Sequence, residues 1–141
     1  MPGFKINFLD HVAIRVRDVE ASVLWYEKVL GLKRYQLKEW GSYPVFMLSG
    51  TSGIAIFPAT LKDPILDSNS KNSKIDHFAF NVSQDDFKKA QEEFNALKIS
   101  FEFQDHFYFH SIYIKDPDDH TVELTTLLVP ESSFYNKDTY E

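Results

Sequence analysis

Apolar and polar positions recur in the same order in the two halves of the chain. Segment 10–16 (DHVAIRV) matches segment 76–82 (DHFAFNV) at four of seven positions, and both alternate as half-buried strands do. Apolar residues at helical spacing follow each segment, over 18–30 in the first half and from the N-cap Ser83 to Leu97 in the second. The pattern therefore predicts an internal repeat in which a strand precedes a helix.

Three short runs rich in β-branched and aromatic residues follow each helix, separated by turn-forming residues. The runs cover 32–40, 43–48, 53–57, 100–104, 107–115 and 121–127. The sequence thus predicts an α+β fold in which two βαβββ modules form one curved mixed sheet, a cup, with helices on the outer face. We expect a single domain, 1–141, made of module one (about 8–60), a linker (61–73), module two (about 74–127) and a C-terminal tail (128–141).

Composition limits the partners that the protein is expected to have. The 15 Lys and Arg residues against 21 Asp and Glu give a formal charge of −6, which disfavours nucleic acid and membrane surfaces. No cysteine occurs, so disulfides, thiol nucleophiles and cysteine-ligated metals are excluded. No apolar run approaches the roughly 20 residues that span a bilayer, and segment 1–10 lacks a secretory pattern. We expect a cytoplasmic protein that acts on a small molecule.

Three side chains are candidates for a metal site. Strand alternation turns His11 away from its helix, together with Arg15, which is either a contact for an anionic substrate group or a partner of a surface carboxylate. His77 is the repeat equivalent of His11, and Glu123 lies on the matching face of a late strand. If the halves pair around a pseudo-two-fold axis, two imidazoles and a carboxylate meet, as at catalytic zinc and non-haem iron sites. The alternative is that the histidines merely begin strands and Glu123 faces solvent.

Two further motifs resemble those of the vicinal oxygen chelate superfamily. Segment 116–124 reads DPDDHTVEL, and segment 24–32 reads LWYEKVLGL. With the two strand-starting histidines and the order of elements, they make the chain similar to this superfamily over about 8–127. The superfamily contains glyoxalase I, fosfomycin-resistance proteins, extradiol dioxygenases and bleomycin-binding proteins.

The resemblance implies a metal site and a substrate site. Position by position, the superfamily's ligands fall on His11, His77 and Glu123, and the cofactor would be a divalent metal (Zn, Mn, Fe or Ni) whose identity is not assigned. A Ser-x-Tyr of the fosfomycin-resistance branch falls on Ser111 and Tyr113, which alternation points into the cup as substrate contacts. As catalytic residues we expect the ligand Glu123 and, as hydrogen-bond donor to an oxyanion, Tyr113. The alternative for Tyr113 is an ordinary cross-strand role.

Three departures from the superfamily narrow the function. Glyoxalase I has a further glutamate on its fourth strand, where this chain has an apolar residue near Ile56. Asp119 stands where glycine is usual, and because Asp tolerates the left-handed conformation we expect the turn to form. Segment 125–130 offers no match for phosphonate-binding basic residues, which argues against fosfomycin as substrate.

The remaining histidines and aspartates do not predict a second metal site. Four residues along a strand span roughly 13 Å, so His106 and His110 cannot share an ion, and His120 lies in a later turn. Asp116 and Asp118 lack the glycine and distant glutamate of a calcium loop.

The sequence therefore predicts a metal-dependent enzyme whose divalent ion chelates vicinal oxygens of a small substrate, with isomerase, lyase or transferase-type chemistry. The alternative is a metal-free small-molecule-binding protein of the bleomycin-resistance type. We also expect a homodimer, because superfamily members often pair and the tail aromatics Phe134, Tyr135 and Tyr140 would gain from burial.

Overall fold

The computed structural model describes residues 3, 7–59, 75 and 77–134, and the chain divides into two compact units, Met1–Asn72 and Ser73–Glu141. The predicted linker 61–73 and the tail residues Tyr135 and Tyr140 lie outside the described residues. None of the helices in the described ranges has both the length and the apolar character needed to cross a membrane.

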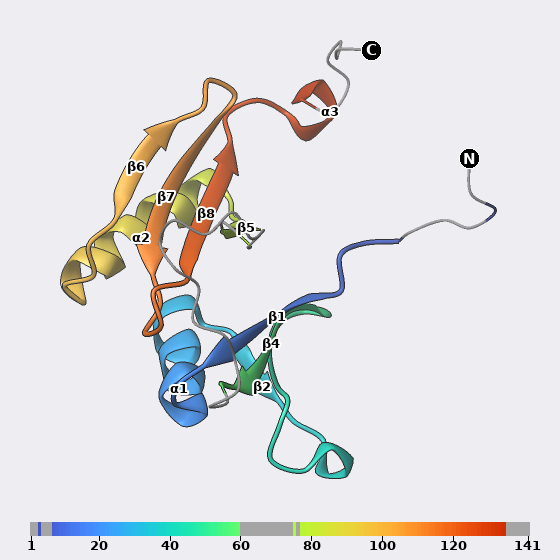
Figure 1. Ribbon diagram of the computed structural model, residues 1–141. Helices are drawn as coiled ribbons and strands as arrows, with labels where there is room; N and C mark the ends of the chain where they lie inside the picture. The colour runs from blue at the N-terminus through green and yellow to red at the C-terminus, as the bar shows by residue number, and fades with distance from the viewer. Residues whose placement is uncertain (1–2, 4–6, 60–74, 76, 135–141) are drawn as a thin grey trace, which may run out of the picture. The chain divides into compact units, whose positions relative to one another are not determined.

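The first unit folds in the predicted order of one strand, one helix and three strands. Its elements are β1 (His11–Val16), α1 (Val19–Leu30), β2 (Lys33–Tyr35), a short 3-10 helix η1 (Lys38–Trp40), β3 (Val45–Ser49) and β4 (Ser52–Pro58). The strands form a mixed sheet in the order β1-β4-β3-β2, in which β1 and β4 run parallel and the other pairs antiparallel (Figure 1).

The second unit repeats this connectivity and adds a short helix. Its elements are β5 (Phe78–Asn81), α2 (Gln84–Ala96), β6 (Glu102–Asp105), β7 (Phe109–Lys115), β8 (Thr121–Leu127) and α3 (Glu131–Phe134). The sheet order β5-β8-β7-β6, with β5 and β8 parallel, is that of the first unit. The α+β class and the two βαβββ units are therefore confirmed, whereas one domain joining both units stays a prediction.

Side-chain caps begin both helices, and a glycine ends the first one. The side chain of Asp18 accepts a hydrogen bond from the backbone N–H of Ala21, and Gly31 ends α1 in the left-handed conformation with φ 66°. Ser83 caps α2 by accepting from the N–H of Asp86. These caps satisfy helix-end donors and fix where each helix starts against its sheet.

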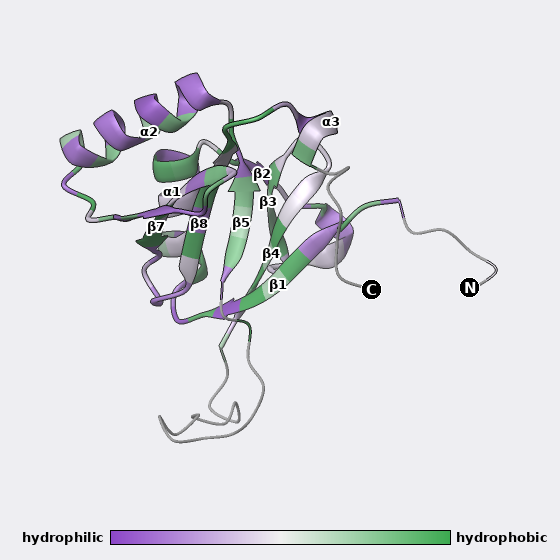
Figure 2. Ribbon diagram, turned by 90° about the horizontal axis from the view of Figure 1, so that it is seen from above, coloured by the Kyte–Doolittle hydropathy of each residue, from purple (hydrophilic) through white to green (hydrophobic). Residues whose placement is uncertain are grey.

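The sheet of the second unit is apolar on the face that α2 covers. Phe87 and Phe94 of α2 are buried, and α2 packs against β8. Ile112 and Val122, which are fully buried, project from β7 and β8 on this face. Figure 2 shows α2 mostly purple with narrow green bands, as expected for a helix that buries only one stripe. The opposite face carries most of the polar side chains of β7 and β8.

Two predicted strands are shorter than their apolar runs. The run 32–40 leaves the sheet after Tyr35, because the Gln36 amide donates to the carbonyl oxygens of Gly41 and Ser42 and so supports a loop that contains η1. The run 107–115 pairs only from Phe109 onward, because the chain turns beforehand.

The turn between β7 and β8 forms as predicted, with Asp119 in the left-handed conformation at φ 65°. It is built around Asp116, which is 4% exposed. One carboxylate oxygen of Asp116 accepts from the backbone N–H groups of Asp118 and His120, at 2.9 and 2.8 Å, and the other lies 2.7 Å from His120 Nδ1. This hydrogen bond raises the pKa of His120 above its ordinary value of 6.5, against the opposing effect of partial burial.

The start of the predicted tail is ordered as α3. Phe134 packs edge-on against Tyr108 and Phe109, with ring centroids 6.1 and 6.0 Å apart. One of the aromatic residues that suggested dimerisation is thus partnered within its own unit, and the homodimer stays a prediction.

Candidate metal and substrate site

Polar side chains form cross-strand rows on the face of the second sheet that α2 does not cover. Strand register places Tyr113 of β7 directly between Glu102 of β6 and Glu123 of β8. The next row along the strands consists of Gln104, Ser111 and Thr125. Alternation along β7 therefore sends Ser111 and Tyr113 to this face, as predicted.

Glu123 is buried but has partners for both carboxylate oxygens. The residue is 5% exposed, so the alternative of a solvent-facing Glu123 is wrong. Oε2 accepts a hydrogen bond of 2.7 Å from the Ser111 hydroxyl, and Oε1 lies 3.0 Å from His77 Nε2. Since a buried carboxylate is costly without such partners, Ser111 and His77 account for its presence in the sheet.

Tyr113 contacts two histidines. Its ring lies edge-on to that of His77, with centroids 5.8 Å apart, and its hydroxyl is 2.9 Å from His106 Nε2. The contact between His106 and Tyr113 is not predicted by the sequence. No spacing signal reveals it, because His106 reaches the site from the β6–β7 turn, where Phe107 takes a positive φ of 72°.

His110 belongs to the other face of the sheet. Its ring contacts Phe103 and Phe87, and its Nε2 lies 3.5 Å from Asp105 Oδ1. His106 and His110 therefore point to opposite faces, which agrees with the rejection of a shared metal site. Within the described residues of either unit, no group of three or more His, Asp or Glu side chains is placed to hold a metal ion.

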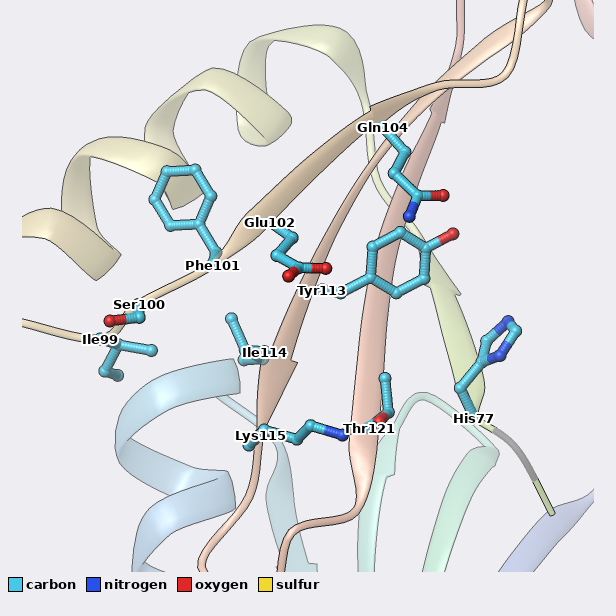
Figure 3. Close-up of a pocket in the computed structure, with 10 residues that line it drawn as sticks. All are labelled: His77, Ile99, Ser100, Phe101, Glu102, Gln104, Tyr113, Ile114, Lys115 and Thr121. Atoms are coloured by element: carbon cyan, nitrogen blue, oxygen red, sulfur yellow. Dashed lines mark hydrogen bonds between the residues drawn. The ribbon is translucent and has the colours of Figure 1, made fainter. Parts of the chain in front are cut away.

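A pocket of about 890 Å³ opens on the polar face of the second unit (Figure 3). Its polar lining consists of His77, Ser100, Glu102, Gln104, Tyr113, Lys115 and Thr121. Ile99, Phe101 and Ile114 supply the apolar part. The pocket thus lies beside the His77–Glu123 pair and offers both polar and apolar surface to a small molecule.

Two of the predicted site residues lie in the first unit. His11 begins β1; its Nδ1 is 2.7 Å from Asp10 Oδ2, and its ring lies edge-on to Phe46 at 5.0 Å. Arg15 is on the same face and donates a hydrogen bond to the Pro58 carbonyl oxygen. A site that combines them with the residues of the second unit stays a prediction.

Ala55, which is next to Ile56, corresponds to Glu123 by strand register. Ile56 is fully buried on the face that α1 covers, paired with Ile14. Ala55 pairs with Ala13, as Glu123 pairs with Ala79 in the second unit, and Ala13 and Ala79 are repeat equivalents. The first-unit counterpart of Glu123 is therefore an alanine.

Residues 8–124 match the model of the Glyoxalase/Bleomycin resistance protein/Dioxygenase superfamily. The chain is 28% identical to the metallothiol transferase FosB of Lysinibacillus sphaericus (strain C3-41) over 137 residues, which are 94% of this chain and 92% of the relative. A glyoxalase/dioxygenase of Nostoc punctiforme superposes with a TM-score of 0.72 at 20% identity, covering 93% of this chain and 97% of that one. The fosfomycin resistance protein FosX of Mesorhizobium loti superposes with a TM-score of 0.62 at 25% identity, covering 93% and 99%. The chain belongs to the glyoxalase/bleomycin resistance/dioxygenase superfamily.

Proposed function

We propose that this protein is a metal-dependent enzyme whose divalent ion binds two oxygen atoms of a small substrate. The observation that carries the proposal is the approach of His77 Nε2 to within 3.0 Å of Glu123 Oε1 beside a pocket. An imidazole nitrogen and a carboxylate oxygen suit Zn, Mn, Fe or Ni, and we propose His11 as the third ligand. When bound, the ion would polarise the chelated oxygens and stabilise negative charge on them.

Neighbouring residues support these ligand roles. Ser111 engages Glu123 Oε2 and so directs Oε1 toward His77. Asp10 holds Nδ1 of His11, the arrangement by which a carboxylate orients a ligating imidazole through its other nitrogen. These contacts would restrict the orientations of the Glu123 carboxylate and the His11 imidazole before a metal ion binds.

We propose Tyr113 as the hydrogen-bond donor to the oxyanion that develops on the substrate. The Tyr113 side chain lines the pocket. His106 is proposed as its positioning residue, with Nε2–H donating to the Tyr113 hydroxyl oxygen. Ser111 and Arg15 stay as proposed substrate contacts, the latter for an anionic group.

The proposed reaction is the transfer of a nucleophile to an electrophilic carbon, with isomerisation and elimination as related outcomes of the same charge stabilisation. The similarity to a metallothiol transferase supports transfer. Glyoxalase chemistry is disfavoured because Ala55, the counterpart of Glu123, cannot act as a base.

Metal removal and reloading test this proposal. Protein stripped with a chelator and reloaded with Zn²⁺, Mn²⁺, Ni²⁺ or Fe²⁺ is assayed for thiol transfer to small electrophiles, for isomerisation of the methylglyoxal hemithioacetal and for catechol cleavage. We expect turnover of electrophiles only in loaded protein, and none of the hemithioacetal or of catechol. Robust hemithioacetal turnover that Glu123→Gln abolishes would contradict the reaction class, and equal turnover by stripped protein would contradict metal dependence.

A metal-free small-molecule-binding protein is the second candidate. It is favoured by the direct contact between His77 and Glu123, which form a pair that is satisfied without an ion. In that case ligand affinity would be the same in stripped and loaded protein.

A further inference from the structure

Two polar side chains of β6 face the pocket without a partner. The Glu102 carboxylate and the Gln104 amide line the pocket, and neither forms a hydrogen bond or ion pair with any described residue. Figure 3 shows both groups on the pocket side of β6, with the Tyr113 ring beside them. Both residues are exposed, so their polar groups are hydrated in the free protein and accessible to a ligand.

Their position relative to the proposed ligands follows from strand register. Glu102, Tyr113 and Glu123 are direct cross-strand neighbours on β6, β7 and β8. Two interstrand spacings, about 10 Å, therefore separate the backbone positions of the two glutamates. A small molecule chelated at the Glu123 end can extend over Tyr113 and reach Glu102 with its other end.

The charge of the lining decides which chemical group that end should carry. Among the described residues that line the pocket, Lys115 is the lysine and there is no arginine. The ammonium group of Lys115 donates a hydrogen bond to the Thr121 hydroxyl. Among the described residues, Glu102 forms no hydrogen bond or ion pair with Lys115 or another cation, and the chain as a whole has a formal charge of −6. The potential at the Glu102 end therefore favours a cation and repels a carboxylate or phosphonate.

We propose that the substrate carries a protonated amine at the end remote from its chelating oxygens, bound by the Glu102 carboxylate and the side-chain oxygen of Gln104. This inference rests on the proposed function, because the proposed metal anchors the other end. It assigns the substrate to the class of amino-substituted oxygen chelators.

Three catechols that differ only in their side arm test the inference. Dopamine carries an ammonium group, 3,4-dihydroxyphenylacetate a carboxylate and 4-methylcatechol no charge, and all three present vicinal oxygens. Their affinities for the full chain are measured by calorimetry. The protein is loaded with Zn²⁺, because this ion is redox-inert, and oxygen is excluded, because it oxidises catechols. We expect dopamine to bind about fivefold to tenfold more tightly than 4-methylcatechol, and the carboxylate to bind most weakly.

Variants assign the preference to one side chain. Glu102→Gln should bring the three affinities to within about twofold, and Glu102→Lys should reverse their order. Glu92→Gln, an exposed glutamate of α2 that does not line the pocket, should leave the preference intact. Zinc-dependent binding of 4-methylcatechol with no preference for dopamine, or a preference that survives in Glu102→Gln, would overturn the inference alone. Tighter binding of the carboxylate, which would point to Lys115, would also overturn it. Zinc-independent binding of 4-methylcatechol would overturn the proposed function and this inference with it.

Discussion

Replacing Glu123 with glutamine is expected to lower zinc affinity by about 100-fold to 1,000-fold. A four-ligand zinc site binds its ion with about 10–16 kcal/mol, so one ligand accounts for roughly 3 kcal/mol. Glutamine is nearly isosteric and can still hydrogen-bond Ser111, so the change removes mainly the negative charge beside His77. Competition titration with a chromophoric chelator measures the affinity.

Two controls separate ligand loss from general damage. Glu92→Gln changes an exposed glutamate of α2 and should bind zinc as the wild type does. Ser111→Ala leaves the Glu123 carboxylate in place but removes its hydroxyl partner, so we expect an intermediate loss of about 10-fold to 100-fold. Wild-type affinity in Glu123→Gln would show that this carboxylate is not a ligand.

Asp116→Ala is expected to destabilise the protein by about 3 kcal/mol and to lower its Tm by about 10 °C. The substitution removes the acceptor for the backbone N–H groups of Asp118 and His120 in the turn that leads into β8. Asp116 is buried, so water replaces these hydrogen bonds poorly. Urea or thermal unfolding measures the change, and Glu92→Ala on the surface should stay within about 0.5 kcal/mol of wild type.

The same turn makes part of the stability depend on pH. Because the pKa of His120 is raised in the folded protein, the charged His120–Asp116 pair contributes fully below the unfolded value of 6.5 and is lost as pH rises through the folded value. As pH rises across this range, the free energy of unfolding should decrease in wild type, and this decrease should be absent in Asp116→Ala. A parallel pH dependence in both proteins would contradict the assignment to this pair.

Period-two alternation predicted which sheet face the candidate side chains occupy, because it acts within a single strand. It turned Ser111 and Tyr113 to the face of the second sheet that α2 does not cover. Capping chemistry likewise predicted the start of α2 at Ser83, since the responsible side chain is local. Features that are determined by residues close together in the chain could therefore be predicted from the sequence.

Two features were not predicted, because one depends on contacts with a loop and the other on a turn. The apolar run after α1 reads as a strand up to Trp40, but side-chain hydrogen bonds of Gln36 to the following loop end pairing at Tyr35. His106 reaches Tyr113 only because of the backbone conformation of the β6–β7 turn.

The contact between His106 and Tyr113 changes how the proposed oxyanion donor is understood. The proposed role requires the tautomer in which His106 Nε2–H donates to the Tyr113 oxygen over 2.9 Å, because the single hydroxyl hydrogen of Tyr113 is then left for the substrate. His106 also packs on Phe109, with centroids 4.8 Å apart, so its own ring is held. The donor is thus supported by a second layer of contacts before substrate binds.

The zinc content of the reconstituted chain tests the central claim most directly. Wild type, His77→Ala and the control His110→Ala, whose histidine lies on the α2 face, are dialysed with Zn²⁺, freed of unbound metal and analysed by mass spectrometry. The account predicts about one zinc per chain in wild type and His110→Ala, and far less in His77→Ala. Wild-type protein that retains no more zinc than His77→Ala would contradict it.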